Sequence, residues 1–370
     1  MQPISSRWNT DVLLADGAMG TLLLDRAPAT TTCVERLNLD HRELVARAHA
    51  EYVAAGARLI ESNTFAANRL KLAAHELREH LLEINTAGVR LAREAAGDRA
   101  YVAGSIGPLG ALMRPLGLVE HGEASEVFAE HIAAVAGAAP DLLLLETFGS
   151  VEEALLALAE AKRIAPSLPV VVSLSVLEDG KTPGGDPLLP ALRRLRAEGA
   201  DALGVNCAVG PQGVYDVLAP VIAHIDVPVF VMPNAGYPHR IDDRAVYQSS
   251  PEYFRRFAHD FVAIGANVIG GCCGTTPEHI AAVAAAAPDL LLLETFGSVE
   301  EALLALAEAK RIVPSLPVVV SLSVLEDGKT PGGDPLLPAL RRLRAEGADA
   351  LGVNCAVGPQ GVYDVLAPVI

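Results

Sequence analysis

One stretch decides the fold of this chain: Asn267-Val268-Ile269-Gly270-Gly271-Cys272-Cys273-Gly274-Thr275-Thr276-Pro277. Its apolar, β-branched start predicts a buried strand, and its Thr-Thr-Pro end predicts the beginning of a helix. The two cysteines therefore lie on a sharp turn, where glycine lets the backbone come close to a bound group. Three interpretations are open here: a metal site, a phosphate loop built on Gly270 and Gly271, and a pair of inert buried thiols.

A third cysteine favours the metal site. Gly204-Val205-Asn206-Cys207 is also an apolar strand that ends in a thiol. Two such strand ends supply three thiolates and leave the fourth position of a tetrahedral zinc ion open, which is the arrangement of a catalytic zinc.

Strand and helix patterns alternate outward from this stretch. Besides the strand at its start, strands are predicted at 12–15, 58–61, 101–105, 142–145, 170–176, 202–206 and 229–232. Helices are predicted at 42–55, 81–96, 125–138, 150–164, 188–198, 251–264 and 277–286. Eight alternating units predict parallel strands in an α/β fold, and a closed (β/α)8 TIM barrel over an open sheet. Polar residues follow the strands, as expected for an active site at the carboxyl ends of barrel strands.

The alternation is followed by a repeat. Residues 278–370 repeat residues 130–222, and the two copies differ only at Gly137 against Ala285 and at Ala165 against Val313. Architectural repeats diverge because each unit packs against different neighbours, so this repeat indicates a recent duplication or an assembly error. We expect a barrel over residues 1–288, with residues 289–370, the duplicate of 141–222, outside it. The first copy should fill the barrel because it is tied to barrel strands on both sides.

Composition excludes several classes of function. The net charge of −16 over 370 residues argues against nucleic-acid binding, which needs a basic surface. The chain shows no signal peptide at its start and no apolar run of membrane-spanning length. Its five cysteines, an odd number, favour metal or catalytic use in a reducing compartment, so we expect a cytoplasmic protein.

The three-cysteine pattern resembles a known family. GVNC at 204–207, GGCCGTTPEHI at 270–280 and DGAMGT at 16–21 are similar to the homocysteine-binding domain of homocysteine S-methyltransferases. The resemblance covers residues 10–288 and is closest to methionine synthases and to relatives fused to a methylenetetrahydrofolate reductase. It implies a (β/α)8 barrel, homocysteine as substrate, and zinc (Zn2+) held by Cys207, Cys272 and Cys273, which also act as the catalytic residues.

The resemblance also implies a substrate site made of Asp16, Gly17, Glu146, Ser175 and Asn234. The glycine-rich turn at Gly17 offers amides to the substrate carboxylate, and Glu146 offers a carboxylate to its ammonium group. Asn234 would fill the open zinc position when substrate is absent. Each polar residue also has a plain structural interpretation: a turn for Asp16 and Asn234, a solvated carboxylate for Glu146, and strand packing for Ser175.

The expected reaction is methyl transfer to homocysteine, giving methionine. Zinc would make the substrate thiol a thiolate, which is the nucleophilic form. The methyl donor is left open between methylcobalamin, methylfolate, S-methylmethionine and betaine, on a fused or separate module. Two alternatives remain: a duplicated chain without activity, and a phosphate-binding barrel lyase or isomerase.

Overall fold

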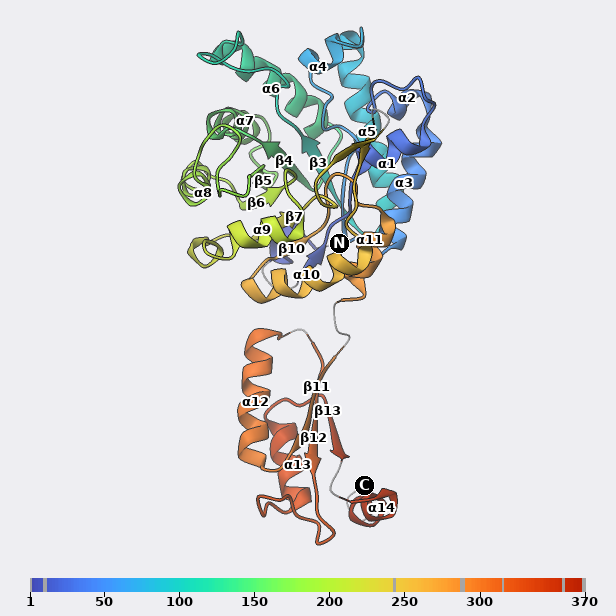
Figure 1. Ribbon diagram of the computed structural model, residues 1–370, viewed down its shortest axis with the longest axis vertical. Helices are drawn as coiled ribbons and strands as arrows, with labels where there is room; N and C mark the ends of the chain where they lie inside the picture. Colours follow the sequence, from blue (N-terminus) through green and yellow to red (C-terminus); the bar gives the residue numbers. More distant parts are fainter. Residues whose placement is uncertain are drawn as a thin grey trace. The chain divides into compact units, whose positions relative to one another are not determined.

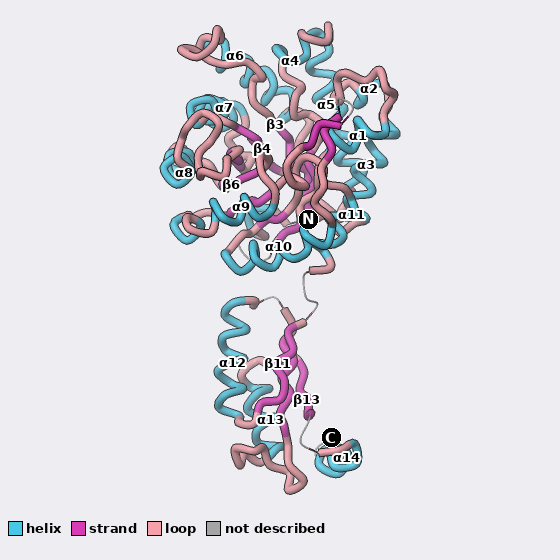
Figure 2. The backbone as a smooth tube through the Cα atoms, viewed as in Figure 1, coloured by secondary structure: helices cyan, strands magenta, loops and turns pink. Residues whose placement is uncertain are grey.

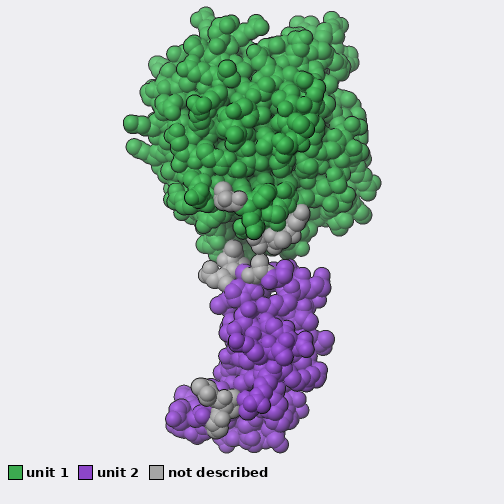
Figure 3. All heavy atoms as spheres, turned by 180° about the vertical axis from the view of Figure 1, so that it is seen from behind, with its two compact units in different colours: residues 1–286 green, residues 287–370 purple. Residues whose placement is uncertain are grey.

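The computed structural model describes residues 2–8, 12–241, 244–286, 290–314, 316–354 and 357–367. The chain divides into two compact units, residues 1–286 (unit 1) and 287–370 (unit 2), shown in different colours in Figure 3. In the part of the chain that is described, no helix is long and apolar enough to cross a membrane.

Unit 1 is built on a sheet of eight parallel strands in the order β1-β10-β7-β6-β5-β4-β3-β2. The strands are β1 (Leu13–Leu14), β2 (Leu59–Glu61), β3 (Tyr101–Ile106), β4 (Leu142–Phe148), β5 (Val170–Leu174), β6 (Ala202–Asn206), β7 (Val229–Met232) and β10 (Val268–Ile269). A separate two-stranded ribbon, β8 (His239–Ile241) with β9 (Arg244–Val246), follows β7.

The sheet closes between β1 and β2. The amide of Arg58 donates to the carbonyl of Leu14 at 2.7 Å, and the amide of Asp16 donates to the carbonyl of Leu59 at 3.0 Å. These bonds join the two ends of the strand order, so the eight strands form a (β/α)8 barrel with helices around it (Figures 1 and 2). The predicted fold of unit 1 is confirmed.

Helices surround the barrel because each presents one apolar face to the strands. They are α1 (Met19–Arg26), α2 (Leu37–Asp40), α3 (Arg42–Ala54), α4 (Arg69–Ala73), α5 (Leu81–Ala96), α6 (His121–Ala136), α7 (Val151–Ile164), α8 (Leu188–Ala197), α9 (Pro211–Leu218), α10 (Pro251–Ile264) and α11 (Pro277–Ala284). The sequence patterns missed α1, α2, α4 and α9, which are short, and placed the start of α6 four residues late, at 125 instead of 121.

The barrel interior is a packed layer of side chains. Alternate residues of the strands point inward, and Leu144, Val171 and Phe230 are among those that are fully buried there. Ile4 and Trp8 belong to the same cluster, and the Trp8 ring lies edge-on to Phe230 with centroids 6.0 Å apart. The N-terminal segment therefore packs against the side chains of the barrel interior. An active site is expected at the carboxyl ends of the strands, as in other barrels of this kind.

Unit 2 repeats one part of the barrel by itself. Its strands β11 (Leu291–Phe296), β12 (Val318–Ser323) and β13 (Ala350–Asn354) form a parallel sheet in that order. Its helices are α12 (Val299–Ile312), α13 (Leu336–Ala345) and α14 (Pro359–Leu366). The first copy supplies β4 to β6 of the eight-stranded sheet, and the second copy forms a three-stranded sheet. The expected division into a barrel over residues 1–288 and an accessory copy over residues 289–370 stays a prediction.

Candidate metal and amino-acid site

The three predicted cysteines meet at the carboxyl ends of two strands. Cys207 directly follows β6, while Cys272 and Cys273 follow β10, and β7 lies between these strands. The three sulfur atoms all lie within 4.8 Å of one another, and the Sγ atoms of Cys207 and Cys273 are 3.9 Å apart.

This spacing fits a tetrahedral metal ion. Sulfur ligands about 2.3 Å from zinc lie roughly 3.8 Å from each other in tetrahedral geometry. The Asn234 side chain hydrogen-bonds to Cys207, while its own buried Oδ1 has no partner within the described residues. The three cysteine sulfurs are soft ligands of the kind that zinc prefers. The same Oδ1 of Asn234 lies beside them, where a fourth ligand position would be open.

The backbone at Cys207 is held in an uncommon conformation. Cys207 and Ala208 have φ angles of 61° and 54°, in the left-handed region that few residues other than glycine adopt. The amide of Cys207 donates to the carbonyl of Met232 at 3.1 Å, and the amide of Val209 donates to the carbonyl of Cys207 at 2.7 Å. These bonds fix the turn that directs the thiol toward the other two.

The second turn depends on two glycines. A Cβ on Gly271 would lie 2.5 Å from Oγ1 of Thr275, and a Cβ on Gly274, where φ is 79°, would lie 2.1 Å from the Tyr247 ring. Thr275 uses its hydroxyl to donate to the Cys272 carbonyl at 2.7 Å and to accept from the Ala18 amide at 3.0 Å. The turn is thereby joined to the start of α1.

The phosphate-loop interpretation of Gly270 and Gly271 is wrong. The Gly270 amide donates to the Val231 carbonyl at 3.0 Å, and the Gly271 amide donates to the Asp16 carbonyl at 2.9 Å. A phosphate loop needs free amides that converge on the ligand, and these two are already used within the barrel.

The cysteine cluster concentrates negative charge on Cys207. Hydrogen bonds from Cys272 and Cys273 are the main cause that lowers the pKa of Cys207, to about 3. The same interactions raise the pKa of Cys273 to about 12 and that of Cys272 well above its usual range. Cys207 is thus the thiolate of the cluster and accepts hydrogen bonds from the other two thiols, so a cation placed between the three sulfurs would meet a negative charge there.

A cavity of about 700 Å3 opens from the thiols. Its wall includes the three cysteines, the turn at Gly17 and the beginning of α1, and the carboxyl groups of Glu61 and Glu146. The first amides of α1 have no acceptor inside their own helix, so they can bind an anionic group there.

Glu146 is fixed at the cavity by a polar network. One of its carboxylate oxygens accepts from the Ser105 hydroxyl, and the other accepts from Nδ2 of Asn206 at 3.2 Å. Oδ1 of Asn206 accepts in turn from the Ser173 hydroxyl at 2.8 Å. Burial is the main cause that raises the pKa of Glu146 to about 7. The carboxyl group is therefore oriented and can carry a charge close to neutral pH.

Asp16 lies behind the cavity wall. It is fully buried, its Oδ2 accepts from the Glu61 amide at 3.0 Å, and its Oδ1 has no partner within the described residues. Burial raises the pKa of Asp16 and of Glu61 well above the usual range. Asp16 thus positions the end of β2, and Glu61 is the second carboxyl group on the cavity wall.

The remaining predicted residues are near the site but not on the cavity wall. Ser175 is buried just beyond β5, where its amide donates to the Phe148 carbonyl at 2.9 Å, and Asn234 reaches the cluster only through Cys207. No sequence pattern pointed to Glu61, Ser105, Ser173 or Asn206 as site residues. Glu61 and Asn206 end barrel strands, and that position was the available signal.

The duplicate does not contribute to this site. Cys355, the counterpart of Cys207, lies outside the described residues. Glu294, the counterpart of Glu146, is exposed in unit 2, where its carboxylate accepts from Asn354 at 3.1 Å.

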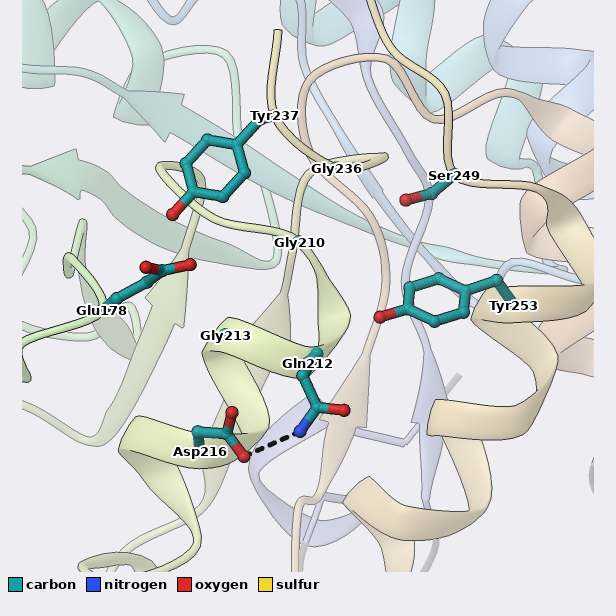
Figure 4. A pocket seen from close by; sticks show the side chains of 9 residues that line it. All are labelled: Glu178, Gly210, Gln212, Gly213, Asp216, Gly236, Tyr237, Ser249 and Tyr253. Atoms are coloured by element: carbon teal, nitrogen blue, oxygen red, sulfur yellow. Dashed lines mark hydrogen bonds between the residues drawn. The ribbon is translucent and has the colours of Figure 1, made fainter.

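A second hollow, of about 410 Å3, lies beside α9 and contains no thiol (Figure 4). Four of its polar side chains form two pairs. Nε2 of Gln212 donates to Asp216 at 2.7 Å, and a hydrogen bond between Tyr237 and Glu178 raises the pKa of the tyrosine to about 12. The cysteine cavity is therefore the stronger candidate for a functional site.

Comparisons with known proteins agree with this choice. The model of the family described as homocysteine S-methyltransferase matches residues 13–287 and, through the duplicate, residues 283–369. The methionine synthase of Mycobacterium leprae (strain TN) is 32% identical over 292 residues, which cover 74% of this chain and 24% of that protein. The methionine synthase of Mycobacterium tuberculosis is 31% identical over 296 residues, 75% of this chain and 25% of that protein. The chain thus spans about a quarter of the length of these relatives.

Solved structures show the same fold. The metallated form of the homocysteine methyltransferase MmuM from Escherichia coli superposes with a TM-score of 0.66 at 26% identity, over 77% of this chain and all of that one. Its apo form superposes with a TM-score of 0.59 at 27% identity, over 75% of this chain and 96% of that one.

Proposed function

Because this chain belongs to the homocysteine S-methyltransferase family, we propose that unit 1 transfers a methyl group to the thiol of homocysteine and releases methionine. The observation that carries this proposal is the convergence of three thiols and an oriented carboxyl group on one cavity. A zwitterionic amino acid with a terminal thiol complements both features.

The two ends of the amino-acid group have separate partners. Glu146 would accept hydrogen bonds from the substrate ammonium group, with Glu61 as a second carboxyl group beside it. The amides at Gly17 and the start of α1 would donate to the substrate carboxylate. When both ends are fixed, the side chain of the substrate points toward the cysteines. Binding energy is thereby used to hold the thiol in the geometry that the reaction needs.

Cys207, Cys272 and Cys273 would hold a zinc ion, which when bound supplies the substrate thiol as a thiolate at neutral pH. The Asn234 amide supports Cys207, because a hydrogen bond to a ligating sulfur fixes its orientation. Three free thiols of this kind suit a reducing compartment such as the cytoplasm.

The methyl donor would enter through the rest of the cavity. A volume of about 700 Å3 exceeds the need of one small amino acid, so a second group fits beside it. Methylcobalamin, methylfolate and S-methylmethionine are the donors we propose to test. Since the methionine synthases are about four times longer than the matched segment, a separate or fused module would present the donor.

An inactive, misassembled chain is the competing proposal. Every residue of the candidate site comes from unit 1, whose barrel is complete with the first copy in place. The presence of the duplicate therefore leaves every residue of the site in place, and this favours the active enzyme over the inactive chain.

Zinc content tests the proposal directly. The purified chain should contain one zinc ion, and Cys272→Ser should lose stoichiometric zinc because only two thiolates remain. The measurement is elemental analysis after dialysis against a mild chelator.

The matched control is Cys355→Ser, which alters the duplicated cysteine and should leave the zinc content unchanged. Full zinc in Cys272→Ser, or equal losses in both variants, would show that the ion is held elsewhere. Transfer of a methyl group from any donor to homocysteine is the second arm of the test, and complete inactivity with zinc bound would favour the competing proposal.

A further inference from the structure

One face of the unit 2 sheet exposes apolar residues near the amino ends of its strands, while Ser321 and Ser323, further along the same face, are buried. Its residues Leu290, Leu292, Val319 and Ala350, here called the inner face, are the counterparts of barrel-interior residues. In unit 2, Leu290 is 45% exposed and Leu292 is 51% exposed, Ala350 is exposed and Val319 is half-buried. Their counterparts in the barrel all have an exposed fraction of zero: Leu142, Leu144, Val171 and Ala202.

The opposite face of the same sheet is covered as it is in the barrel. Val318, Val320 and Leu322 are fully buried in a cluster with residues of α12 and α13. Unit 2 also keeps local bonds of the first copy, such as the ion pair of Lys310 with Asp349. The sheet is therefore folded as β4 to β6 are, and what it lacks is the cover that the other five strands give in the barrel.

The barrel shows what this face packs against. In unit 1 the equivalent residues share one core with Trp8, Phe230 and Val268. A second chain could offer that cover by exchanging its own first copy for the duplicate. Such an exchange gains nothing, because each chain carries two copies but its barrel has one place for them. One copy per chain would remain uncovered.

Pairing of the surplus copies, in contrast, reduces the uncovered apolar area of both chains. We propose that two chains associate through the inner faces of their unit 2 sheets, packed face to face about 10 Å apart. The interface is isologous, so each face packs against its own copy. This inference is independent of the catalytic proposal.

Charge selects the orientation of the pair. Glu294 follows Leu292 on the same face, at the carboxyl end of the sheet, and is exposed. A two-fold axis that runs across the strands places the two Glu294 carboxylates at opposite ends of the interface, whereas an axis along the strands would bring these like charges together. The strands of the two sheets then run antiparallel across the interface.

The size of the inner face sets the strength of the pair. The sheet of three strands, each of five or six residues, measures roughly 15 by 20 Å, and the inner face is only the apolar part of it. This is smaller than the standard interface of about 800 Å2 per partner, so we expect a dimer that dissociates on dilution, on the order of micromolar concentration.

Sedimentation velocity over a dilution series of the full chain tests the inference. Wild-type protein should pass from dimer to monomer on dilution, and Leu292→Asp should be monomeric throughout. The matched control is Leu304→Asp, on the outer side of α12 and 74% exposed, which should dimerise as the wild type does. Circular dichroism of both variants checks that unit 2 remains folded.

Hydrogen exchange gives a readout that does not need a variant. Amides of β11 to β13 should lose protection on dilution while those of the barrel strands do not change. A wild type that is monomeric at all concentrations, a Leu292→Asp variant that still dimerises, or equal effects of Leu292→Asp and Leu304→Asp would each overturn the inference. Retained dimers in Leu292→Asp would instead indicate strand exchange with the barrel.

Discussion

Glu146 and Glu294 are one residue in two copies of the same segment, and only their surroundings differ. Each accepts a hydrogen bond from the asparagine that ends its third strand, Asn206 at 3.2 Å and Asn354 at 3.1 Å. Glu146 is 5% exposed at the cavity of the barrel, while Glu294 is exposed to solvent. The local geometry is shared, so a difference in function between them measures what the cavity contributes.

We expect Glu146→Gln to weaken homocysteine binding by roughly tenfold to a hundredfold, the usual loss for one buried hydrogen bond to a charged group. The zinc content should not change. Glu294→Gln is the control and should bind as the wild type does. Isothermal titration calorimetry measures both.

The pH dependence gives the same experiment a second arm. The ionised carboxylate attracts the substrate ammonium group, and burial raises the pKa of Glu146 to about 7. Wild-type affinity should therefore increase as the pH rises through about 7, and this part of the dependence should be absent in Glu146→Gln. Equal affinities of wild type and Glu146→Gln would place the ammonium group elsewhere.

At the scale of elements, α3 contains a buried histidine that destabilises the folded barrel at low pH. His49 is fully buried on the inner side of α3, and neither ring nitrogen has a partner within the described residues. Burial lowers the pKa of His49 to about 4, because the imidazolium form cannot be solvated there.

This shift makes the stability of the barrel depend on pH. Below the unfolded pKa of about 6.5 the unfolded chain takes up a proton that the folded chain does not, so the free energy of unfolding decreases as the pH falls toward about 4. His49→Met removes this uptake. Relative to the wild type, we expect it to gain about 2 kcal/mol between pH 7.5 and pH 5.

Urea unfolding followed by Trp8 fluorescence provides the measurement, because Trp8 is the one tryptophan of the chain and lies in the barrel core. His259→Met, which alters an exposed histidine on α10, is the control and should show no such gain. A parallel shift of both pH profiles would contradict the assignment.

The two copies also show what the sequence can predict. Thr147 and Thr295 have left-handed φ angles of 61° and 65°, and the strand register shifts after Leu145 and again after Leu293. These features occur in both units, so the segment determines them locally, and local patterns were sufficient to place the strands. Burial of the inner face requires the other five strands, and no local pattern contains that information.

The site was predictable to the same extent. Cysteine at a strand end has few roles, so Cys207, Cys272 and Cys273 could be grouped before their geometry was known. Serine and glutamate have many roles in proteins. Ser173 and Ser175 are two residues apart and so fall on the same side of an extended strand. Ser173 reaches Asn206 because it lies within β5, whereas Ser175 lies beyond the end of that strand, and only the folded structure settles where the strand ends.

At the scale of the whole molecule, the barrel is complete without the duplicate. The eight strands and the candidate site lie within residues 1–286. Unit 2 has its own apolar cluster and its own sheet. We therefore propose that the chain is organised as a barrel followed by an accessory copy of three of its strands.

A chain that ends at Ala286 should fold and keep both zinc and homocysteine binding at wild-type affinity. Its solubility should increase, because the exposed leucines of unit 2 are absent. Elemental analysis, calorimetry and the concentration at the onset of precipitation check these three expectations. An unfolded product would mean that unit 2 is part of the barrel core and that the proposed organisation is wrong.

The position of the thiols in the strand order has a mechanical consequence. Cys207 and Cys272 follow β6 and β10, two strands that are not hydrogen-bonded to each other because β7 lies between them. An ion held by these thiols is therefore a cross-link that closes a loop containing β7, the β8–β9 ribbon and α10. By polymer statistics, closing a loop of this length removes about 4 kcal/mol of chain entropy from the unfolded state. The cysteines proposed as metal ligands would then also stabilise the last quarter of the barrel. Local unfolding of this part of the barrel would depend on whether metal is bound.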